Sequence, residues 1–164
     1  MNDSFEIFST TKDILSQWHK CSFRDKFDTL YNSTEQYMMA EKALLFEGKN
    51  GVYDEIMQSK DMKIIKNLGK KVEGFNQELW DEKKEQIVYD GNYLKFSQNE
   101  KFKKYLLSTK NSLIIEANPN DTIWACGLSP NNPNLRDKTQ WKGKNLLGFI
   151  LMRVRENLSD NSYE

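Results

Sequence analysis

The chain has 164 residues and a formal net charge of zero at pH 7. This length suits one domain with a sizeable core, and the zero net charge excludes a global field that attracts nucleic acid, so a nucleic-acid ligand requires a local basic patch. The single histidine, His19, argues against a histidine-rich metal site and against a histidine-based catalytic triad. We therefore expect no metal and no cofactor, and chemistry that rests on Asp, Glu and Lys.

The two cysteines, Cys21 and Cys126, form no CxxC pair. They give no disulfide framework and favour a reduced, cytoplasmic setting. No apolar run approaches the length of a membrane span, and no signal peptide is visible. We expect a cytoplasmic protein without a membrane partner.

The first third of the chain is expected to contain two short strands and a capped helix. The strands are expected at 4–9 and 27–31, with a loop between them. Ser33 and Gln36 then form a capping-box pattern, and apolar residues recur behind it at helical spacing. The glycines at 48–51 are expected to end this helix.

The middle of the chain is expected to be helical. A short helix is expected at 54–59, and Asp61 and Asn76 are residues of the type that caps a helix start. The helix after Asn76 has two possible ends, because Asp90-Gly91 can stop it while 92–96 can continue it.

The last third is expected to be mixed. Asn99 or Ser97 is expected to cap a helix, and short apolar runs predict strands at 113–117 and 123–128. Asn145 is expected to cap a final helix with a clear apolar stripe. The sum is an α+β fold: a single helix-rich domain with a few short strands over 1–158, and a flexible tail at 159–164.

Glu35 and Lys42 lie seven residues apart on the first predicted helix, which places them on one face, about 10 Å apart along the axis. A carboxylate and an amine in this arrangement can flank a small ligand. Alternatively, Glu35 favours the helix dipole and Lys42 is solvated. From this stretch alone the second explanation is favoured.

Two further clusters are open to a functional or a structural explanation. Asp121 and Trp124 can share a cleft in a turn, or Asp121 makes an Asx-turn while Trp124 fills the core. Lys95 and Asn99 near a helix start can bind an anion such as phosphate, or form a solvated cap. In both, the structural explanation is favoured without further information, and no P-loop, GxGxxG or HExxH motif is present.

Four blocks of sequence carry a family resemblance. They are Ser33-x-Glu35-Gln36-Tyr37-Met38-Met39-Ala40-Glu41-Lys42-Ala43, Lys95-Phe96-Ser97-Gln98-Asn99, Glu116-Ala117-Asn118-Pro119-x-Asp121-x-x-Trp124 and Trp141-x-Gly143-x-Asn145-Leu146-Leu147-Gly148. In this order and spacing the chain resembles the NADAR family, also called YbiA-like. The similarity runs from about Leu15 to Leu158, nearly the whole chain.

The chain departs from the family pattern at three places. Members often have Ser-Asn-Phe where this chain has Ser16-Gln17-Trp18, at the expected substrate lip. They often have Trp-Gly where this chain has Trp124-Ala125, and Glu-His-Tyr where it has Glu35-Gln36-Tyr37. The last departure removes a possible proton carrier but keeps the capping box.

The resemblance implies hydrolysis of an N-glycosidic bond at a ribose. One branch of the family removes ADP-ribose from guanine bases in nucleic acid and acts as antitoxin to a DNA ADP-ribosyltransferase. Another branch cleaves riboflavin-biosynthesis intermediates and releases ribose 5-phosphate. The expected function is the first, on guanine in single-stranded DNA or a nucleoside, with the toxin as functional partner; the small ribosyl-amine metabolite is the alternative. An alternative of another class is a non-catalytic ADP-ribose or NAD-derivative binding module.

The resemblance also implies roles for particular residues. Glu35 is expected to be the main catalytic carboxylate, Asp121 its partner, and Lys42 a candidate for an imine with the opened sugar. The remaining site residues are expected to bind substrate by stacking, by shaping the pocket or by holding phosphate: Gln17, Trp18, Trp80, Lys95, Asn99, Trp124, Trp141 and Asn145.

Overall fold

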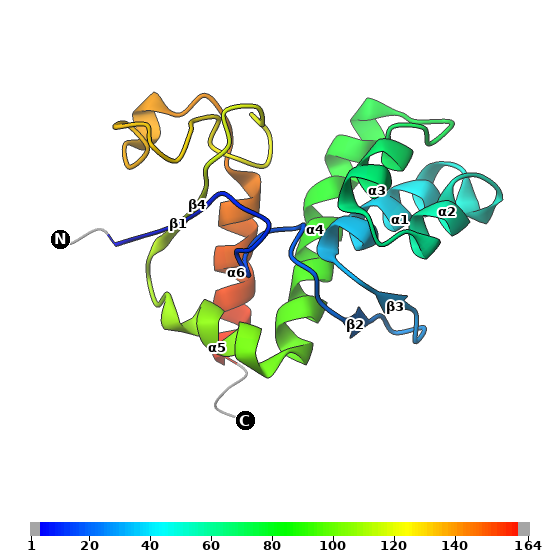
Figure 1. Ribbon diagram of the computed structural model, residues 1–164, viewed down its shortest axis with the longest axis horizontal. Coiled ribbons are helices and arrows are strands. Elements are labelled where there is room, and N and C mark those ends of the chain that lie inside the picture. Colours follow the sequence, from blue (N-terminus) through cyan, green and yellow to red (C-terminus); the bar gives the residue numbers. More distant parts are fainter. Residues whose placement is uncertain (1–3, 161–164) are drawn as a thin grey trace. The chain divides into compact units, whose positions relative to one another are not determined.

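The computed structural model describes residues 4–160, and these form two compact units. Unit 1 consists of residues up to Ser16 together with those from Glu100, and unit 2 is the continuous segment Gln17–Asn99. The mixture of helices and short strands confirms the predicted α+β class (Figure 1). Within residues 4–160, no helix combines the length and apolar character that crossing a membrane requires.

Unit 1 is built around a two-stranded parallel sheet of β1 (Phe5–Phe8) and β4 (Leu113–Glu116). The helix α6 (Leu146–Asp160) packs against β4 and against α5 (Glu100–Ser108). A short 3-10 helix, η2, spans Lys138–Gln140. The strands predicted at 4–9 and 113–117 are therefore confirmed, because the two segments pair with each other.

The strand predicted at 123–128 is wrong, because this segment consists of turns and bends. Backbone carbonyls of residues 122–125 accept hydrogen bonds from the amides of 144–147. Ala125, Cys126 and Leu128 are nevertheless buried. The apolar run reflects burial in a loop rather than pairing in a sheet.

Unit 2 is organised around one helix, α1 (Thr34–Phe46), which packs against each of the other three α-helices of the unit. Figure 1 shows these helices gathered around it. The remaining elements of the unit are β2 (Phe23–Arg24), β3 (Leu30–Tyr31), η1 (Gly48–Asn50), α2 (Tyr53–Gln58), α3 (Met62–Gly69) and α4 (Gln77–Gln98).

The predicted helix starts of unit 2 are confirmed by their caps. Asp61 and Asn76 accept hydrogen bonds from the first-turn amides of α3 and α4. Ser33 Oγ accepts a hydrogen bond of 3.0 Å from the amide of Gln36, whereas Gln36 Oε1 accepts from the amide of Asn32 at 2.8 Å. The Gln36 amide group also donates to the carbonyl of Ile56, so this one side chain ties the start of α1 to α2.

Gly91 does not end α4, which continues to Gln98. A Cβ atom at Gly91 would lie 2.6 Å from Cδ1 of Tyr37, on α1. The glycine is therefore required for the close approach of the two helices, and helix continuation was the correct alternative.

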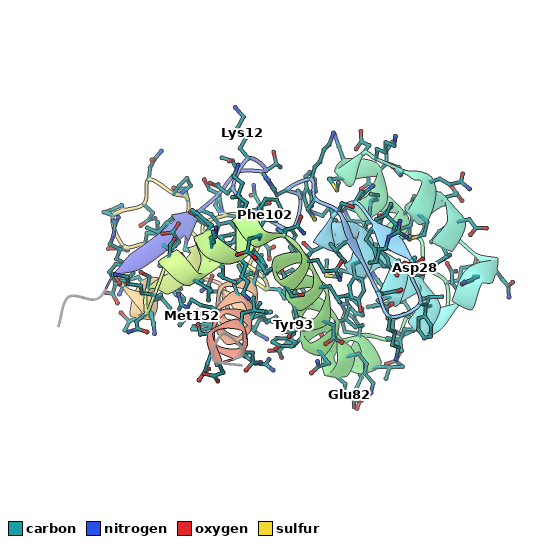
Figure 2. The ribbon with its side chains drawn as sticks, turned by 90° about the horizontal axis from the view of Figure 1, so that it is seen from below. Lys12, Asp28, Glu82, Tyr93, Phe102 and Met152 are labelled. Carbon is teal, nitrogen blue, oxygen red and sulfur yellow. The ribbon has the colours of Figure 1, made fainter. Side chains whose placement is uncertain are left out.

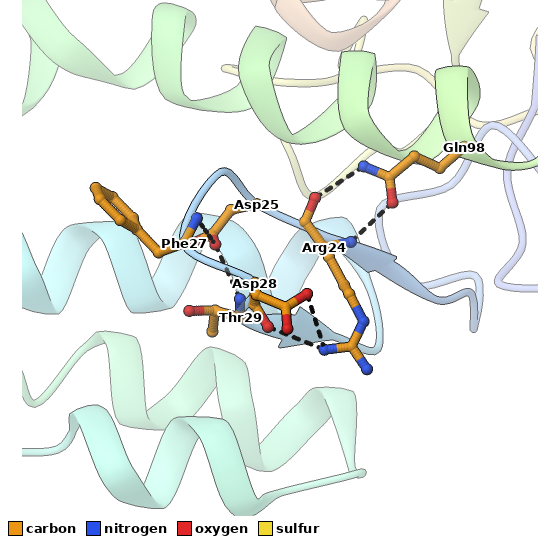
Figure 3. A network of polar contacts seen from close by, with 6 residues as sticks. All are labelled: Arg24, Asp25, Phe27, Asp28, Thr29 and Gln98. Carbon is orange, nitrogen blue, oxygen red and sulfur yellow. Dashed lines mark hydrogen bonds and ion pairs between the residues drawn. The ribbon is translucent and has the colours of Figure 1, made fainter.

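The strand predicted at 27–31 is shortened to Leu30–Tyr31 by a tight turn, drawn in Figure 3. Asp25 Oδ1 accepts hydrogen bonds from the amides of Phe27 and Thr29, and Asp28 has a positive φ of 65°. The side-chain amide of Gln98 pairs with both backbone groups of Arg24, at 2.9 and 2.8 Å, and so fixes this hairpin to the end of α4.

The predicted domain boundary at 158 stays a prediction. Ser159 and Asp160 of the expected tail belong to α6, and residues 161–164 lie outside the described residues.

Candidate functional site

One face of α1 carries Glu35, Met39 and Lys42, which lie one turn apart. Gly69, the last residue of α3, lies against the side chain of Met39, where a Cβ atom would collide with the sulfur. The glycine therefore lets α3 pack directly beside the face that holds the two predicted catalytic residues.

Glu35 is buried, with 4 % of its surface exposed, although it carries a carboxyl group. Its amide donates a hydrogen bond of 3.1 Å to the carbonyl of Gln17, and the hydroxyl of Thr34 donates to the same oxygen. The segment that begins with Gln17 is thus fixed to the first turn of α1, and a contact of Gln17 with substrate stays a prediction.

Asn92 of α4 extends this arrangement, and sequence reasoning did not identify it. Its Nδ2 donates to Gln17 Oε1 at 2.9 Å and to the carbonyl of Val88 at 2.8 Å. Its Oδ1 is buried and accepts no hydrogen bond from the described residues. The i, i+4 bond to Val88 keeps the Asn92 amide directed at the site edge rather than at solvent.

Lys42 Nζ lies over two aromatic rings, 4.7 Å from the centroid of Phe75 and 5.5 Å from that of Trp80. These rings occupy the positions just before the Asn76 cap and in the first turn of α4, which commonly form a hydrophobic staple. That spacing was visible in the sequence and could have identified Phe75. Trp80 is buried beside the lysine amine, and its role in binding substrate stays a prediction.

Burial lowers the pKa of Lys42, and the nearby Glu35 carboxylate opposes this shift. The π faces of the rings also favour the charged amine. A lowered pKa provides more of the neutral amine, which is the nucleophilic form. The α1 face therefore combines a buried carboxylate with an amine whose pKa is lowered by burial.

Trp18 is half-buried at the same edge of the unit, next to Gln17 in the chain. Lys66 of α3 extends over its indole ring, with Nζ 5.9 Å from the centroid. The ring thus connects the segment bound to Glu35 with the exposed face of α3.

Lys95 does not lie at a solvated helix start. It lies in the last turn of α4 and is completely buried, and burial lowers its pKa to about 8, opposed by the charge of Cys21. Asn99 donates hydrogen bonds to the carbonyls of Ser22 and Lys95. In this structure the motif from Lys95 to Asn99 holds the segment that leads into β2, and contact with phosphate stays a prediction.

In unit 1, Asp121 forms the Asx-turn considered above. Its Oδ1 accepts hydrogen bonds of 2.9 Å from the amides of both Ile123 and Trp124. Trp124 is half-buried, and its carbonyl accepts from Leu147 near the start of α6. The turn uses only Oδ1, so the other carboxylate oxygen is left for a catalytic role, which remains a prediction.

The prediction that the Asn145 side chain caps α6 is wrong. The side chain of Asn145 is fully buried, accepts from the amide of Glu116 at 3.0 Å and donates to the carbonyl of Ile114 at 2.9 Å. It therefore extends the hydrogen bonding of β4 instead of capping α6. Trp141 Nε1 donates to the carbonyl of Leu135 at 2.8 Å, and its ring packs against the core of the unit.

A cleft of about 470 Å³ lies between the end of α1 and the start of α4. Phe46 in its wall contacts Phe75 edge-on, with ring centroids 5.2 Å apart. Glu78 and Glu82 give this cleft two carboxylates; Glu82 is labelled in Figure 2. Such a cleft disfavours phosphate groups.

Comparison with known proteins identifies relatives along almost the whole chain. The model of the NADAR domain family matches residues 5–159. N-glycosidase R617 of Acanthamoeba polyphaga mimivirus is 45 % identical over 147 residues, which cover 87 % of this chain and 86 % of that protein. Protein irg-1 of Caenorhabditis elegans is 35 % identical over 130 residues, covering 78 % and 61 % of the two chains.

The fold is also that of a solved structure. The NMR structure of the Escherichia coli protein YbiA superposes with a TM-score of 0.81 at 24 % identity, covering 100 % of this chain and 90 % of that chain. The predicted resemblance is confirmed, and the relatives named N-glycosidase bear out the predicted enzyme class, an N-glycosyl hydrolase.

Proposed function

Because the chain belongs to the NADAR domain family, we propose that it cleaves the bond between a ribose C1 and a base nitrogen, and that its substrate is guanine in nucleic acid carrying ADP-ribose. The observation that carries the chemistry is the α1 face, where the buried Glu35 carboxylate influences the lowered pKa of the Lys42 amine. The modified base and the role of antitoxin to a DNA ADP-ribosyltransferase are inferred from the resemblance described above.

In the proposed mechanism, the neutral amine of Lys42 attacks C1 of the sugar. The bond from C1 to the base nitrogen breaks, and the base leaves with the bonding electrons and gains a proton. The lysine nitrogen loses its protons, the bond from C1 to the ring oxygen breaks, and that oxygen gains a proton as a hydroxyl. Lysine is then left joined to C1 as an imine of the opened sugar. Water then adds to C1 and releases the sugar and the free amine.

Glu35 acts while positive charge develops at C1. A carboxylate held close to that carbon stabilises the charge, and burial strengthens the interaction because little water screens it. Trp80 and Phe75 confine the lysine amine and offer flat apolar faces beside the sugar and base.

The test presents two substrates in parallel to the purified protein. One is a short single-stranded oligonucleotide with ADP-ribose on guanine, and the other is the ribosylaminopyrimidine phosphate of riboflavin biosynthesis. Mass spectrometry follows release of ADP-ribose or of the pyrimidine amine. The proposal expects turnover of the oligonucleotide, and at least a hundredfold lower kcat in Glu35→Gln, roughly the contribution of one charge-stabilising group.

Other outcomes contradict the proposal. Turnover of the metabolite alone would make the protein a metabolic N-glycosidase. Tight binding of ADP-ribose without turnover of either substrate would make it a binding module. Full activity of Glu35→Gln would remove that residue from the mechanism.

Asp121→Asn tests the second carboxylate separately. Asparagine keeps the Oδ1 acceptor that the amides of Ile123 and Trp124 require, and removes only the charge. If Asp121 moves a proton, kcat falls by about a hundredfold while the unfolding temperature is unchanged. An unchanged kcat would show that Asp121 has only a structural role, in the turn.

A further inference from the structure

The exposed face of α3 carries a row of lysines that the proposed mechanism does not use. Lys63, Lys66 and Lys70 are exposed and lie within an arc of about 60° on the helix, over about 10 Å of its axis. Lys60 and Lys71 flank the row, and the only acidic residue of the segment 60–71 is the cap Asp61. We define Lys63, Lys66 and Lys70 as the lysine row.

The row is not explained by the stability of α3. Within residues 4–160, no carboxylate lies within 4.0 Å of these three amines. Lys66 and Lys70 are four residues apart, where like charges destabilise a helix, and Lys63 lies in the first turn, where the helix dipole disfavours a cation. Three unpaired charges on one face are instead suited to an external anion.

The row lies beside the candidate site of unit 2. The side of α3 next to the row contacts Met39, between Glu35 and Lys42, through Gly69, which lies about 60° from Lys66 around the helix. Lys66 also reaches over Trp18, which follows the residue bonded to the Glu35 amide. Figure 1 shows α3 running next to α1. An anion on the row would therefore lie at the edge of the site.

We propose that the lysine row of α3 binds the phosphate backbone of a single-stranded nucleic acid whose modified base enters the Glu35–Lys42 site. This inference rests on the proposed function and specifies its substrate as a strand. The row supplies the local basic patch that a chain of zero net charge needs for a nucleic-acid ligand. Trp18, whose ring lies under the middle lysine of the row, Lys66, provides an aromatic surface for a base beside the bound phosphates.

The first measurement is binding of a 5′-fluorescein-labelled single-stranded oligonucleotide without ADP-ribose, followed by anisotropy at several KCl concentrations. The variant Lys63→Gln/Lys66→Gln/Lys70→Gln removes three phosphate contacts. Each contact on a single strand contributes about 0.7 to the slope of log K against log salt, so the slope becomes shallower by about 2. At low salt we expect binding at least about tenfold weaker.

The matched control removes three exposed lysines of unit 1: Lys12→Gln/Lys101→Gln/Lys104→Gln. Lys12 stands clear of the ribbon in Figure 2. The control has the same net charge as the test variant and should bind like the unchanged protein. Equal weakening in both variants, or none in the row variant, would overturn the proposal, as would binding to phosphatidylserine vesicles in preference to the oligonucleotide.

A kinetic comparison separates this inference from the proposed function. With the row removed, kcat/KM falls about tenfold on the ADP-ribosylated oligonucleotide and is unchanged on ADP-ribosylated guanosine, which has no strand. If the unchanged protein cleaves neither substrate, the proposed function fails, while the anisotropy still decides the lysine row. The double variant Lys63→Gln/Lys70→Gln, which keeps the Lys66–Trp18 contact, repeats the test if the triple variant does not fold.

Discussion

Two lysines of unit 2 have lowered pKa values for the same physical reason, and their surroundings give them different uses. Burial lowers the pKa of both Lys42 and Lys95. Lys42 is only half-buried, so part of its side chain stays open to solvent, and the Glu35 carboxylate lies nearby. Lys95 has no exposed surface and is influenced by Cys21. Only Lys42 combines a nucleophilic form with access.

Reductive trapping should report the pKa of Lys42. We expect borohydride to fix ribose 5-phosphate to the protein, and the rate to rise with pH as the amine loses its proton. Because the Glu35 carboxylate raises this pKa, Glu35→Gln should move the trapping profile to lower pH. Mass spectrometry of peptides containing residue 42 measures the adduct.

The control for trapping is Lys42→Ala, which should give no adduct at that peptide. A profile that stays at the same pH in Glu35→Gln would show that the carboxylate does not act on this amine. Equal labelling of exposed lysines would show that the reaction is not selective.

The lowered pKa of Lys95 should make the free energy of unfolding depend on pH. Its pKa is about 8 when folded and close to the ordinary value of 10.5 when unfolded. Between these values the unfolded chain binds more protons, so the free energy of unfolding rises with pH. From pH 7 to pH 9 we expect a gain of about 1 kcal/mol that is absent in Lys95→Met.

Chemical denaturation of both proteins at each pH measures this difference. Cys21, whose pKa is raised by burial, contributes with the opposite sign as pH approaches its ordinary value of 9.0, and it does so in both proteins, so the difference between them reports Lys95. Equal slopes in the two proteins would mean that Lys95 is charged in the folded state throughout this range.

The role of a residue could be predicted from the sequence where it depends on neighbouring residues in the chain. It could not be predicted where it depends on burial. The caps at Ser33, Asp61 and Asn76 depend on a few neighbouring residues, so the sequence contained the full argument. Lys95 is polar by composition, and only the packing of α4 against the segment before β2 makes it an interior residue. Phe75 could have been identified from its staple spacing to Trp80, whereas Asn92 carries no motif that identifies it without its neighbours in space.

At the scale of elements, glycines decide how closely helices approach. Gly91→Ala should improve the intrinsic helix propensity of α4 by about 1 kcal/mol. The new methyl group would lie 2.6 Å from the Tyr37 ring, and such overpacking costs about 1–3 kcal/mol. We expect net destabilisation in thermal or denaturant unfolding, whereas Ser97→Ala, an exposed change on the same helix, should have little effect. A stabilised Gly91→Ala would show that α1 and α4 can separate without cost.

At the start of α6, a structural role of Asn145 can be distinguished from a role in binding substrate. Asn145→Ala leaves the carbonyl of Ile114 and the amide of Glu116 without their partner, and should cost about 2–4 kcal/mol of stability. The KM of the folded fraction should not change, because the Asn145 side chain is fully buried. Its neighbour Lys144 is exposed, and Lys144→Gln should leave stability unchanged. A raised KM in Asn145→Ala with normal stability would restore the predicted contact with substrate.

Elements could be predicted where a local pattern and the tertiary fold agree. The strand 113–117 and the helices begun by Asp61 and Asn76 belong to this group. The run 123–128 has the composition of a strand, but its carbonyls are used by the amides at the start of α6, a partner that lies about twenty residues away and has no pattern of its own. Spacing placed Glu35 and Lys42 on one face, and the family resemblance supplied their predicted roles and those of the other predicted site residues.

At the scale of the whole molecule, the predicted site residues divide between the two units. Glu35, Lys42 and Trp80 belong to the continuous segment Gln17–Asn99, while Asp121 and Trp124 belong to the unit that both ends of the chain form. The carboxylate and the amine of the proposed imine step are thus encoded in one uninterrupted stretch. That stretch also contains α1 and the helices α2, α3 and α4, which pack against it.

This division predicts that residues 17–99 form the imine without the rest of the chain. Produced alone, the segment keeps the core around α1, and we expect cooperative unfolding and trapping of ribose 5-phosphate at Lys42 by borohydride. If Asp121 contributes to cleavage, the same segment should turn over the ADP-ribosylated oligonucleotide at least about a hundredfold more slowly than the full chain. Trapping and turnover that fall together in a folded segment would show that Lys42 depends on unit 1, and full turnover would remove Asp121 from the reaction.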